Sequence, residues 1–521
     1  MATIIKKIRL INYKRFLYYT ITPNEHINIL VGDNEVGKST VLEAIDLVTS
    51  GSIRKVEAIG LDRLLNSDAV KAFKSGERKI CNLPHIKIEL YLEGNFDFTM
   101  NGKNNSDGIP CDGIRMICAP NPDYYSEIAD SLTENSDYFP FDFYTIRFST
   151  FADQGYSGYR KKIRSLFIVS ESLSSEYATN DFVKRMYSQY TEDNIKERAL
   201  HKSKYRQLKN NFCLESLQSL NDRIPSSKGY SFGLKSCSVF GLENDLMIYE
   251  NDIGIDNQGT GKQVFIKTDF ALERAGDIVD VILIEEPENH LSHVNLRKLI
   301  NIIVNTKKGQ LFISTHNSLI STRLELKNLQ IMHQCSSKNP ISLKDLDDET
   351  AKYFMKAPVA GIIEYILSSK TILVEGPSEY MLFEKFYKST ANTSPENDGV
   401  SIIDIHGLSF KRYLSIAKIL GNKVAVITDN DGDMQKNCVD KYTDFQNDTN
   451  IKIFYDEDEK IKTYEMVLYE NNKELCNQLF GKDPLKYMLN NKTEAAFSLL
   501  NNDTNIVVPD YISNAIKWIR K

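Results

Sequence analysis

The stretch that decides the fold is VGDNEVGKST, residues Val31–Thr40. It fits the pattern G-x-x-x-x-G-K-[ST]. Before it stands Ile27–Val31, an apolar run that predicts a buried strand, and after it Thr40–Leu47, with apolar residues at helical spacing. Glycines in such a loop let backbone N–H groups approach phosphate oxygens, and the helix N-terminus favours negative charge. A glycine-containing turn that fits by chance is the alternative, and the strand–loop–helix context argues against it.

The stretch therefore predicts that the chain binds a nucleoside triphosphate such as ATP together with Mg²⁺. Lys38 is expected to reach the β- and γ-phosphates, and the Ser39 hydroxyl to help hold the magnesium ion. The residues assigned to this site are Gly32, Asn34, Gly37, Lys38, Ser39 and Thr40.

Composition limits the class of protein. With 521 residues the chain is too long for one core, and 41% apolar with 26% charged residues is typical of globular domains. A net charge of −6 gives no overall basic signature, so any nucleic-acid surface must be a local patch. Eight cysteines without a C-x-x-C pair indicate reduced thiols. The start of the chain lacks the apolar run of a signal peptide, and no stretch is long enough to span a membrane, so we expect a cytoplasmic protein.

A second segment returns to the nucleotide site. Val281–Ile284 predicts a buried strand that delivers Glu285 and Glu286 at its carboxyl end. One carboxylate can position Mg²⁺, and the next can polarise the water that attacks the γ-phosphate. Gln310–Thr315 predicts the following strand, which ends at His316, where an imidazole can contact the γ-phosphate.

Between these segments the composition changes near residue 158. Residues 158–222 carry helical patterning, many Lys, Arg and Tyr residues and almost no glycine, which predicts a helical insertion. Such an insertion can form a dimer interface or a basic surface that faces DNA, and a plain solvated helical face is the third alternative.

The last third of the chain predicts a second chemistry. Buried strands are expected at Thr371–Val374, Ser401–Ile405 and Lys423–Ile427, with helices between them, so the sheet should be parallel. Functional groups collect at the carboxyl ends of such strands. This places Glu375 on one edge with the Asp429 and Asp431 pair.

Converging carboxylates repel one another unless a cation neutralises them, and Mg²⁺ or Mn²⁺ with oxygen ligands is the natural choice. Such ions can generate a hydroxide nucleophile and stabilise an in-line attack on phosphorus. A D-x-D sequence in a loop is by itself usually a turn, and Asp433 is expected to be exposed rather than ligating.

The first part of the chain resembles an ABC-type ATPase head of the RecF- and SMC-like group. The resemblance rests on the P-loop, the strand ending in Glu285 and Glu286, the strand ending at His316, and Gly259–Gln263 before them. It implies a head dimer that sandwiches ATP, with Gly259 and Gly261 of one head at the P-loop of the other. Glu285 departs from the usual Asp, and the signature lacks the full LSGGQ pattern. Gln154 is a weak candidate for the Q-loop glutamine.

The last part resembles a Toprim domain, with EGPSE, a Gly turn and a D-x-D pair in order. An ATPase head joined to a Toprim domain is similar to the OLD (overcoming lysogenisation defect) family, and within it to the Gabija group of anti-phage nucleases. The resemblance implies metal ligation or its close support by Glu375, Glu379, Asp429, Asp431 and Glu465. It implies that Lys492 stabilises the phosphate or the leaving oxygen.

The predicted fold is therefore α/β. An ABC-type head (residues 1–157 and 223–345) with a helical insertion (158–222) is joined by a connector (346–370) to a Toprim domain (371–521), whose parallel sheet is flanked by helices. The resemblance implies an ATP-binding, metal-dependent DNA endonuclease in anti-phage defence, acting on double-stranded DNA. It also implies a homodimer or tetramer and a UvrD-like helicase subunit as partner. A RecF-like clamp that binds DNA without cutting it, and a Toprim-type topoisomerase, remain alternatives. A primase would need a template-binding module, often with zinc, that the cysteines do not supply.

Overall fold

The computed structural model describes most of the chain. The described residues are 3–133, 139–158, 162–169, 176–191, 194–224, 229–235, 241–273, 279–289, 291–306, 309–335, 338–357, 361–407, 409–502 and 505–521. The start of the predicted insertion at residues 159–161, and residues 358–360 of the predicted connector, lie outside them. The chain forms two compact units, Met1–His316 with Gln330–Pro340, and Asn317–Leu329 with Ile341–Lys521. Within the described residues, no helix combines the length and the apolar character that crossing a membrane requires.

The first unit contains an antiparallel sheet. Its strands run in the order β2 (Phe16–Ile21), β1 (Ile4–Tyr13), β4 (Ile86–Glu93) and β6 (Cys111–Pro120), and β6 also pairs with β5 (Asn101–Gly102) and β7 (Tyr144–Thr150). The alternation expected for a strand with one buried face is incomplete in β1, because a register shift separates Ile5 from Lys7 and Arg9 is buried between Ile8 and Leu10.

A second sheet of this unit carries the P-loop. The parallel strands β3 (Ile27–Val31), β12 (Gln310–Ser314), β11 (Val281–Glu285) and β8 (Ser165–Val169) are adjacent in this order, and β13 (Leu329–Ile331) lies next to β3. These strands are almost continuously apolar, which is typical of parallel strands buried on both faces. Because they are parallel and in register, their carboxyl ends meet at one edge.

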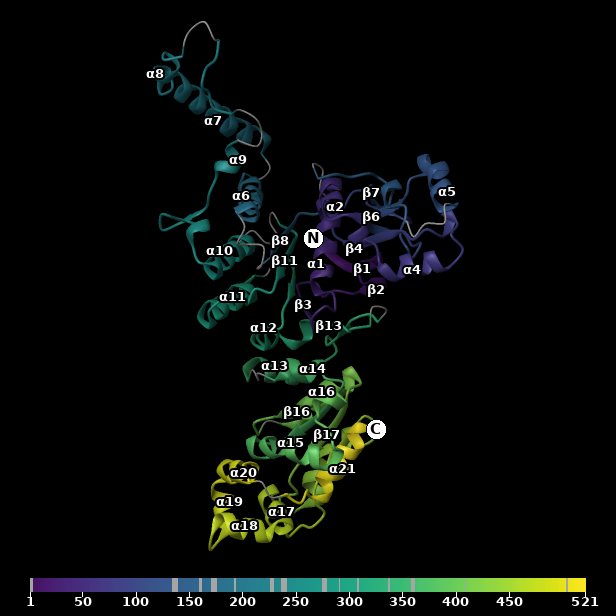
Figure 1. Cartoon of the computed structure of the whole chain (residues 1–521), viewed down its shortest axis with the longest axis vertical. Coiled ribbons are helices and arrows are strands. Elements are labelled where there is room, and N and C mark those ends of the chain that lie inside the picture. The colour runs from purple at the N-terminus through teal and green to yellow at the C-terminus, as the bar shows by residue number, and fades with distance from the viewer. Residues whose placement is uncertain are drawn as a thin grey trace. The chain divides into compact units, whose positions relative to one another are not determined.

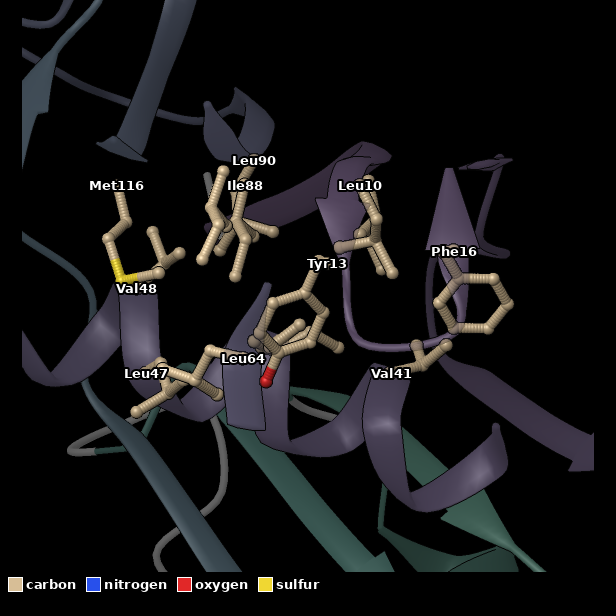
Figure 2. Packing of buried hydrophobic residues seen from close by; sticks show 14 of the residues in the cluster. Leu10, Tyr13, Phe16, Val41, Leu47, Val48, Leu64, Ile88, Leu90 and Met116 are labelled. Atoms are coloured by element: carbon tan, nitrogen blue, oxygen red, sulfur yellow. The ribbon is translucent and has the colours of Figure 1, made fainter. Parts of the chain in front are cut away.

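Helix α1 (Lys38–Ser50) packs between the two sheets, since it contacts β4 and β6 on one side and β8, β11 and β12 on the other. Figure 2 shows Val41, Leu47 and Val48 of this helix close to side chains of β1, β4 and β6. The three are fully buried, and burying one such side chain contributes about 1.5–3 kcal/mol. This core holds the start of α1 against the P-loop.

The predicted insertion differs from the structure at its beginning. Ser165–Val169 is not helical but forms β8, the strand beside β11 in the ATPase sheet. A run of five apolar-rich residues cannot be assigned to a helix or a strand by periodicity alone, and pairing with β11 decides the matter. The predicted helices follow as α6 (Glu176–Tyr190), α7 (Ile195–Glu215) and α8 (Gln218–Asn221).

The other helices described in the first unit range from 4 to 14 residues in length. They are α2 (Ile53–Ile59), α3 (Leu61–Leu64), α4 (Ser67–Ser75), α5 (Tyr125–Thr133), α9 (Leu242–Asp245), α10 (Thr260–Glu273) and α11 (His293–Asn305), with a small hairpin of β9 (Tyr249–Glu250) and β10 (Ile253–Gly254).

The second unit is built on a four-stranded parallel sheet in the order β16 (Val400–Asp404), β15 (Lys370–Val374), β17 (Lys423–Ile427) and β18 (Ile451–Phe454). Figure 1 labels β16 and β17 of this sheet among the helices of the same unit. The three predicted strands are confirmed, and β18 adds an edge strand that the sequence analysis did not predict. Its helices are α12 (Ser318–Arg323), α13 (Asp348–Lys356), α14 (Ile362–Leu367), α15 (Pro377–Ala391), α16 (Phe410–Leu420), α17 (Tyr464–Asn471), α18 (Lys473–Phe480), α19 (Pro484–Asn490), α20 (Lys492–Leu500) and α21 (Asp510–Arg520).

Alternate residues of this sheet face two helical layers. Ile372, Val374 and Ile427 join one buried cluster with residues of α15 and of α17 to α21. Helices α14 and α16 contact β16 and β17 as well. Helices on both sides of a parallel sheet leave the carboxyl ends of its strands as the accessible edge. The α/β fold predicted from the sequence is confirmed.

Candidate functional site

The P-loop follows β3 and depends on two glycines with positive φ. Gly32 has φ 156° and Gly37 has φ 99°. A Cβ atom at Gly32 would lie 2.7 Å from the Met332 carbonyl oxygen, and one at Gly37 would lie 2.6 Å from Cζ of Phe16. Only glycine therefore fits at either position, for steric reasons as well as conformational ones.

Lys38 begins α1 and lies inside the loop. Its ammonium group donates to the carbonyl oxygens of Gly32 and Asp33, both at 2.9 Å, and its side chain is buried. Burial lowers the pKa of Lys38, and the surrounding carboxylates, with Glu286 the strongest, partly oppose this. Asn34 and Ser39 are exposed and Thr40 is half-buried. The predicted loop therefore curves around the ammonium group of Lys38.

Acidic side chains and a histidine lie at the neighbouring strand ends. Glu285 is in register with Ser314, which is in register with Leu30 of β3. Glu286 accepts from the side chain of Asn289 at 2.8 Å, and its carboxylate lies 3.3 Å from Nε2 of His316. The structure therefore brings the predicted acids and His316 to the edge that carries the P-loop.

Glu288 is a member of this cluster that the sequence analysis missed. Its carboxylate accepts from the Thr315 hydroxyl at 2.6 Å and from the His316 N–H at 2.9 Å. Burial raises its pKa. Glu288 therefore holds the backbone of His316 in place. The only sequence signal was a third glutamate two residues after the predicted pair.

The predicted signature segment lies at the start of α10. The Gly259 carbonyl accepts from the N–H groups of Lys262 and Gln263, at 2.9 and 3.0 Å, and a side chain at Gly259 would meet open space. The Gln263 amide donates to the carbonyl of Gln258 at 2.9 Å. Gly261 lies in the first turn of α10. Its action on a second head stays a prediction, as does the assignment of Gln154, which lies exposed in the turn after β7.

The second cluster lies at the carboxyl ends of β15 and β17. Oε1 of Glu375 accepts from the hydroxyl of Thr428 at 2.8 Å and from the backbone N–H of Asp429 at 3.3 Å. Residues 53 and 54 positions apart in the chain are joined here by direct hydrogen bonds. The convergence of Glu375 and Asp429 that the sequence predicted is therefore present.

Two carboxyl groups in this cluster have strongly raised pKa values. Burial raises the pKa of Asp429 to about 8, and the nearby Glu375, Glu379 and Glu465 add to the shift. Burial also raises the pKa of Glu379 to about 7, again with help from Glu375 and Glu465. Strong shifts produced by burial and like charges are typical of functional carboxylates.

Glu465 and Lys492 lie on helices α17 and α20, which follow the strands of the sheet in sequence. Glu465 is buried in the first turn of α17, and Lys492 begins α20. Their side chains form an ion pair of 3.0 Å. Burial lowers the pKa of Lys492, but the hydrogen bond to Glu465 and the charges of Asp429 and Glu379 outweigh it and raise the pKa overall. The lysine therefore stays charged beside the carboxylates.

Asp431 and Asp433 differ from Asp429. Both are exposed, and Asp431 has φ 49°, in the left-handed region. The Asp431 N–H donates to the Lys462 carbonyl at 3.1 Å, whereas the Asp433 carboxylate accepts from the N–H of Lys436 at 3.0 Å. Asp433 is exposed, as the sequence analysis expected, and its carboxylate accepts a hydrogen bond within its own turn.

Asn430, between the paired aspartates, is a second residue that the sequence analysis missed. It is 2% exposed, and the two N–H groups of its amide face three carbonyl oxygens, those of Asp456, Asp458 and Ile461 at 2.9, 3.0 and 3.2 Å, so that one N–H is shared. Its side-chain oxygen accepts from the Gly432 N–H at 2.8 Å. Asn430 therefore ties the loop that carries Asp429 to the loop that leads to Glu465. Asn430 occupies the unspecified middle position of the D-x-D sequence, so nothing in the neighbouring sequence indicates that its amide is buried.

The donor set suits Mg²⁺ or Mn²⁺, although in the described part of the chain no three acidic, His or Cys side chains converge at the spacing of a preformed metal site. Glu375 is turned toward Thr428, and Glu465 toward Lys492. Oxygen-only ligands and mutual repulsion among carboxylates favour a hard divalent cation, which would neutralise the charges that raise the pKa of Asp429. The chemistry of the residues therefore fits such an ion.

Comparisons with known proteins match three segments of the chain. Residues 4–236 match a family model described as an AAA ATPase domain, and residues 259–322 match one described as an AAA domain of the putative AbiEii toxin, type IV toxin–antitoxin system. Residues 366–431, from before β15 to Asp431, match the TOPRIM domain of overcoming lysogenization defect protein-like proteins. The class is thus defined: an ATPase domain and a Toprim domain on one chain.

Among solved structures, the C-terminal region of the Burkholderia pseudomallei OLD protein is 16% identical, covering 29% of this chain and 97% of its own, with a TM-score of 0.23. The Thermotoga maritima SMC head domain is 14% identical, covering 65% of this chain and 98% of its own, with a TM-score of 0.30. No curated protein matches the chain. By these domain matches, the chain carries an ATPase domain and a Toprim domain that is similar to the one in OLD-like proteins.

Proposed function

We propose that this protein is a divalent-metal-dependent DNA endonuclease that nicks or cleaves DNA at the Toprim cluster. The observation that carries the proposal is the direct contact between Glu375 and the Asp429 backbone, with Glu379, Glu465 and Lys492 close enough to shift the pKa of Asp429. Carboxylates gathered at the ends of parallel strands, next to a lysine, suit a phosphodiester substrate better than any neutral one.

Each side chain has a proposed role. Glu375, Glu379, Asp429, Asp431 and Glu465 hold or support Mg²⁺ or Mn²⁺. When bound, such an ion supplies an activated water and neutralises charge on the phosphate. The chain's own residues do the rest. Thr428 fixes the Glu375 carboxylate, Glu465 keeps Lys492 oriented, and Lys492 donates to a phosphate oxygen or to the leaving oxygen.

The ATPase unit is proposed to gate this chemistry. Lys38 and Ser39 would bind the triphosphate and its magnesium ion, with Glu285 near the metal. Glu286 would polarise the attacking water, and His316 would contact the γ-phosphate. Gly259 and Gly261 would act on the P-loop of a second copy, which makes the homodimer, or a tetramer of two such dimers, the working form.

Defence against phage, with double-stranded DNA as target, is the role we infer from the likeness to OLD-type proteins and, within them, to the Gabija group. A UvrD-like helicase subunit is the partner that this likeness suggests.

Incubation with supercoiled plasmid tests the proposal. The full chain with Mg²⁺ or Mn²⁺ should produce nicked or linear DNA, and Asp429→Ala should lower the rate at least about a hundredfold, the scale on which mechanisms that depend on metal ligands fail. Asp433→Asn is the matched control, because it changes an exposed acid in the same loop without a role in the cluster.

The products discriminate among the alternatives. Relaxed but closed circles would favour a topoisomerase over the nuclease. DNA binding without strand breakage would favour a RecF-like clamp. If Asp429→Ala cleaved DNA as fast as the parent protein, the assignment of the Toprim cluster as the cleavage site would be wrong.

A further inference from the structure

The hydroxyl group of Tyr464 is a buried polar group that the chemistry described so far does not use. Tyr464 is the first residue of α17, directly before Glu465, and is 2% exposed. Among the residues that the structure describes, its hydroxyl has no hydrogen-bond partner. Nearly all buried polar groups in proteins are hydrogen-bonded, because an unpaired one destabilises the fold. An unpaired donor at this position therefore calls for a functional explanation.

The ring of Tyr464 is fixed in the core of the second unit, close to the acidic cluster. It belongs to the same buried cluster as Val374, at the end of β15, and side chains of α15. Burial raises the pKa of its phenol, and the nearby carboxylates of Glu379, Glu465 and Asp429 add to the shift, with Glu379 the strongest of the three. The unpaired hydroxyl therefore lies near several of the proposed metal ligands.

Glu379 is the carboxylate best suited to accept from this hydroxyl. It lies in the first turn of α15 and is 9% exposed. Its carboxylate is turned back along its own helix, since Oε2 would lie 3.5 Å from a Cβ atom at Gly376 and the backbone N–H of Glu379 donates to the carboxylate. Within the described part of the chain no other side chain donates to it. The cluster thus holds an unused donor and a carboxylate with unused acceptor positions.

We propose that the hydroxyl of Tyr464 donates to the carboxylate of Glu379 when the Toprim cluster holds Mg²⁺ or Mn²⁺, and so positions Glu379 as a metal ligand. This inference rests on the proposed metal site and adds a positioning residue to it. Carboxylates that ligate metals are usually held by a hydrogen bond to the remaining oxygen, which fixes their orientation. In the metal-free protein Glu379 stays turned toward Gly376, and the hydroxyl stays unpaired.

Tyr464→Phe tests the inference, because it removes the hydroxyl and keeps the ring. Two properties of the full chain are measured without nucleotide: the affinity for Mn²⁺ by calorimetry, and the midpoint of urea unfolding in EDTA. The Mn²⁺ affinity should fall at least about tenfold, the usual loss when a residue that orients a metal ligand is removed. The urea midpoint in EDTA should not fall, because the metal-free protein loses no hydrogen bond. A tyrosine with a structural role alone would give the opposite pair of results.

Tyr413→Phe is the matched control. Tyr413 lies on α16, is fully buried, and likewise has a hydroxyl without a hydrogen-bond partner among the described residues. Burial raises the pKa of Tyr413, and the carboxylate that adds to this shift is Asp404, which is not an assigned ligand. This variant should keep both the Mn²⁺ affinity and the urea midpoint of the parent.

Glu379→Ala identifies the acceptor. If Tyr464 acts through Glu379, then Tyr464→Phe should cause no further loss of Mn²⁺ affinity in the Glu379→Ala background, because the two substitutions remove the same hydrogen bond. A further tenfold loss in that background would show that the hydroxyl does not act through Glu379, and would overturn the inference.

A Tyr464→Phe variant that binds Mn²⁺ as tightly as the parent also overturns the inference, as does one whose urea midpoint falls in EDTA. A parent that binds no Mn²⁺ overturns it together with the metal site. Plasmid nicking by the parent is scored separately. A parent that nicks DNA while Tyr464→Phe keeps its Mn²⁺ affinity retains the nuclease and loses the positioning role. A parent whose Mn²⁺ affinity depends on Tyr464 but which does not nick DNA gives the reverse result.

Discussion

Asp429 is the residue at which the demands of folding and of function conflict most clearly. Burial and three neighbouring carboxyl groups raise its pKa to about 8, from an ordinary value of 3.8. The folded protein therefore binds a proton at Asp429 that the unfolded chain has already released over much of the neutral range. An ionised Asp429 destabilises the fold unless a cation is near.

This conflict predicts a stabilising substitution. Between about pH 4 and pH 8 the folded state binds more protons at Asp429 than the unfolded state, so the stability of the metal-free protein falls as pH rises through this window. Asp429→Asn removes the charge, and we expect it to stabilise the metal-free protein at pH 8 by about 1–3 kcal/mol while abolishing cleavage.

Urea or thermal unfolding in EDTA at pH 5 and at pH 8 measures the effect. The gain should be much smaller at pH 5, where the parent carboxyl is already protonated, and Asp433→Asn should show no comparable gain. An Asp429→Asn variant less stable than the parent at pH 8 would show that the ionised carboxylate does not destabilise the metal-free fold.

At the scale of elements, the strand ends and the loops between them position the chemistry. The ends of β15 and β17 carry Glu375 and Asp429, whereas Glu465 arrives from α17. The link between these parts is Asn430, whose two amide N–H groups face three carbonyl oxygens of residues 456–461. A buried amide with all its donors used fixes two loops at once.

Asn430→Ala should therefore lower both the stability of the protein and the affinity of the Toprim cluster for Mn²⁺. We expect a loss of about 2 kcal/mol in unfolding free energy, and at least tenfold weaker Mn²⁺ binding, because residues that orient ligands carry effects of this size. Asn437→Ala is the control, since its amide donates only to the Asn430 carbonyl among the contacts described. Calorimetric titration with Mn²⁺ measures the affinity. The variant is titrated at a lower temperature, at which it is as stable as the parent, so that the loss of affinity is separated from the loss of stability. Unaltered Mn²⁺ affinity would leave Asn430 with a structural role only.

For the whole molecule, the two compact units predict separable activities. Lys38 lies in the first unit and Glu375 in the second. Lys38→Ala should weaken ATP binding at least tenfold, because the loop loses its buried cation, and should leave Mn²⁺ binding at the Toprim cluster unchanged.

Glu375→Ala should show the opposite pattern, with ATP binding retained and cleavage lost. Fluorescent ATP analogue binding and Mn²⁺ titration on both variants provide the check, with circular dichroism as evidence of folding. A substitution that removed both activities from a folded protein would mean that one site serves both.

Much of this arrangement could be predicted from the sequence. The P-loop and the strands that lead to Glu285, His316, Glu375 and Asp429 follow from local apolar runs bounded by glycine and acidic residues, whereas the two domain types were expected from a family resemblance. Ser165–Val169 could not be assigned, because only pairing with β11 makes it a strand. Glu288 and Asn430 could not be found, because a buried carboxylate and a buried amide are defined by their partners, not by their neighbours in sequence.

The sequence by itself determined which residues form the nucleotide loop and which strands end in carboxylates, because glycine conformations and apolar periodicity act over a few residues. Only the tertiary structure decided that Lys492 pairs with Glu465 beside Asp429, and that Asn430 joins the loop of Asp429 to residues 456–461. These contacts join segments tens of residues apart, and their distances are set by how helices pack on the sheet.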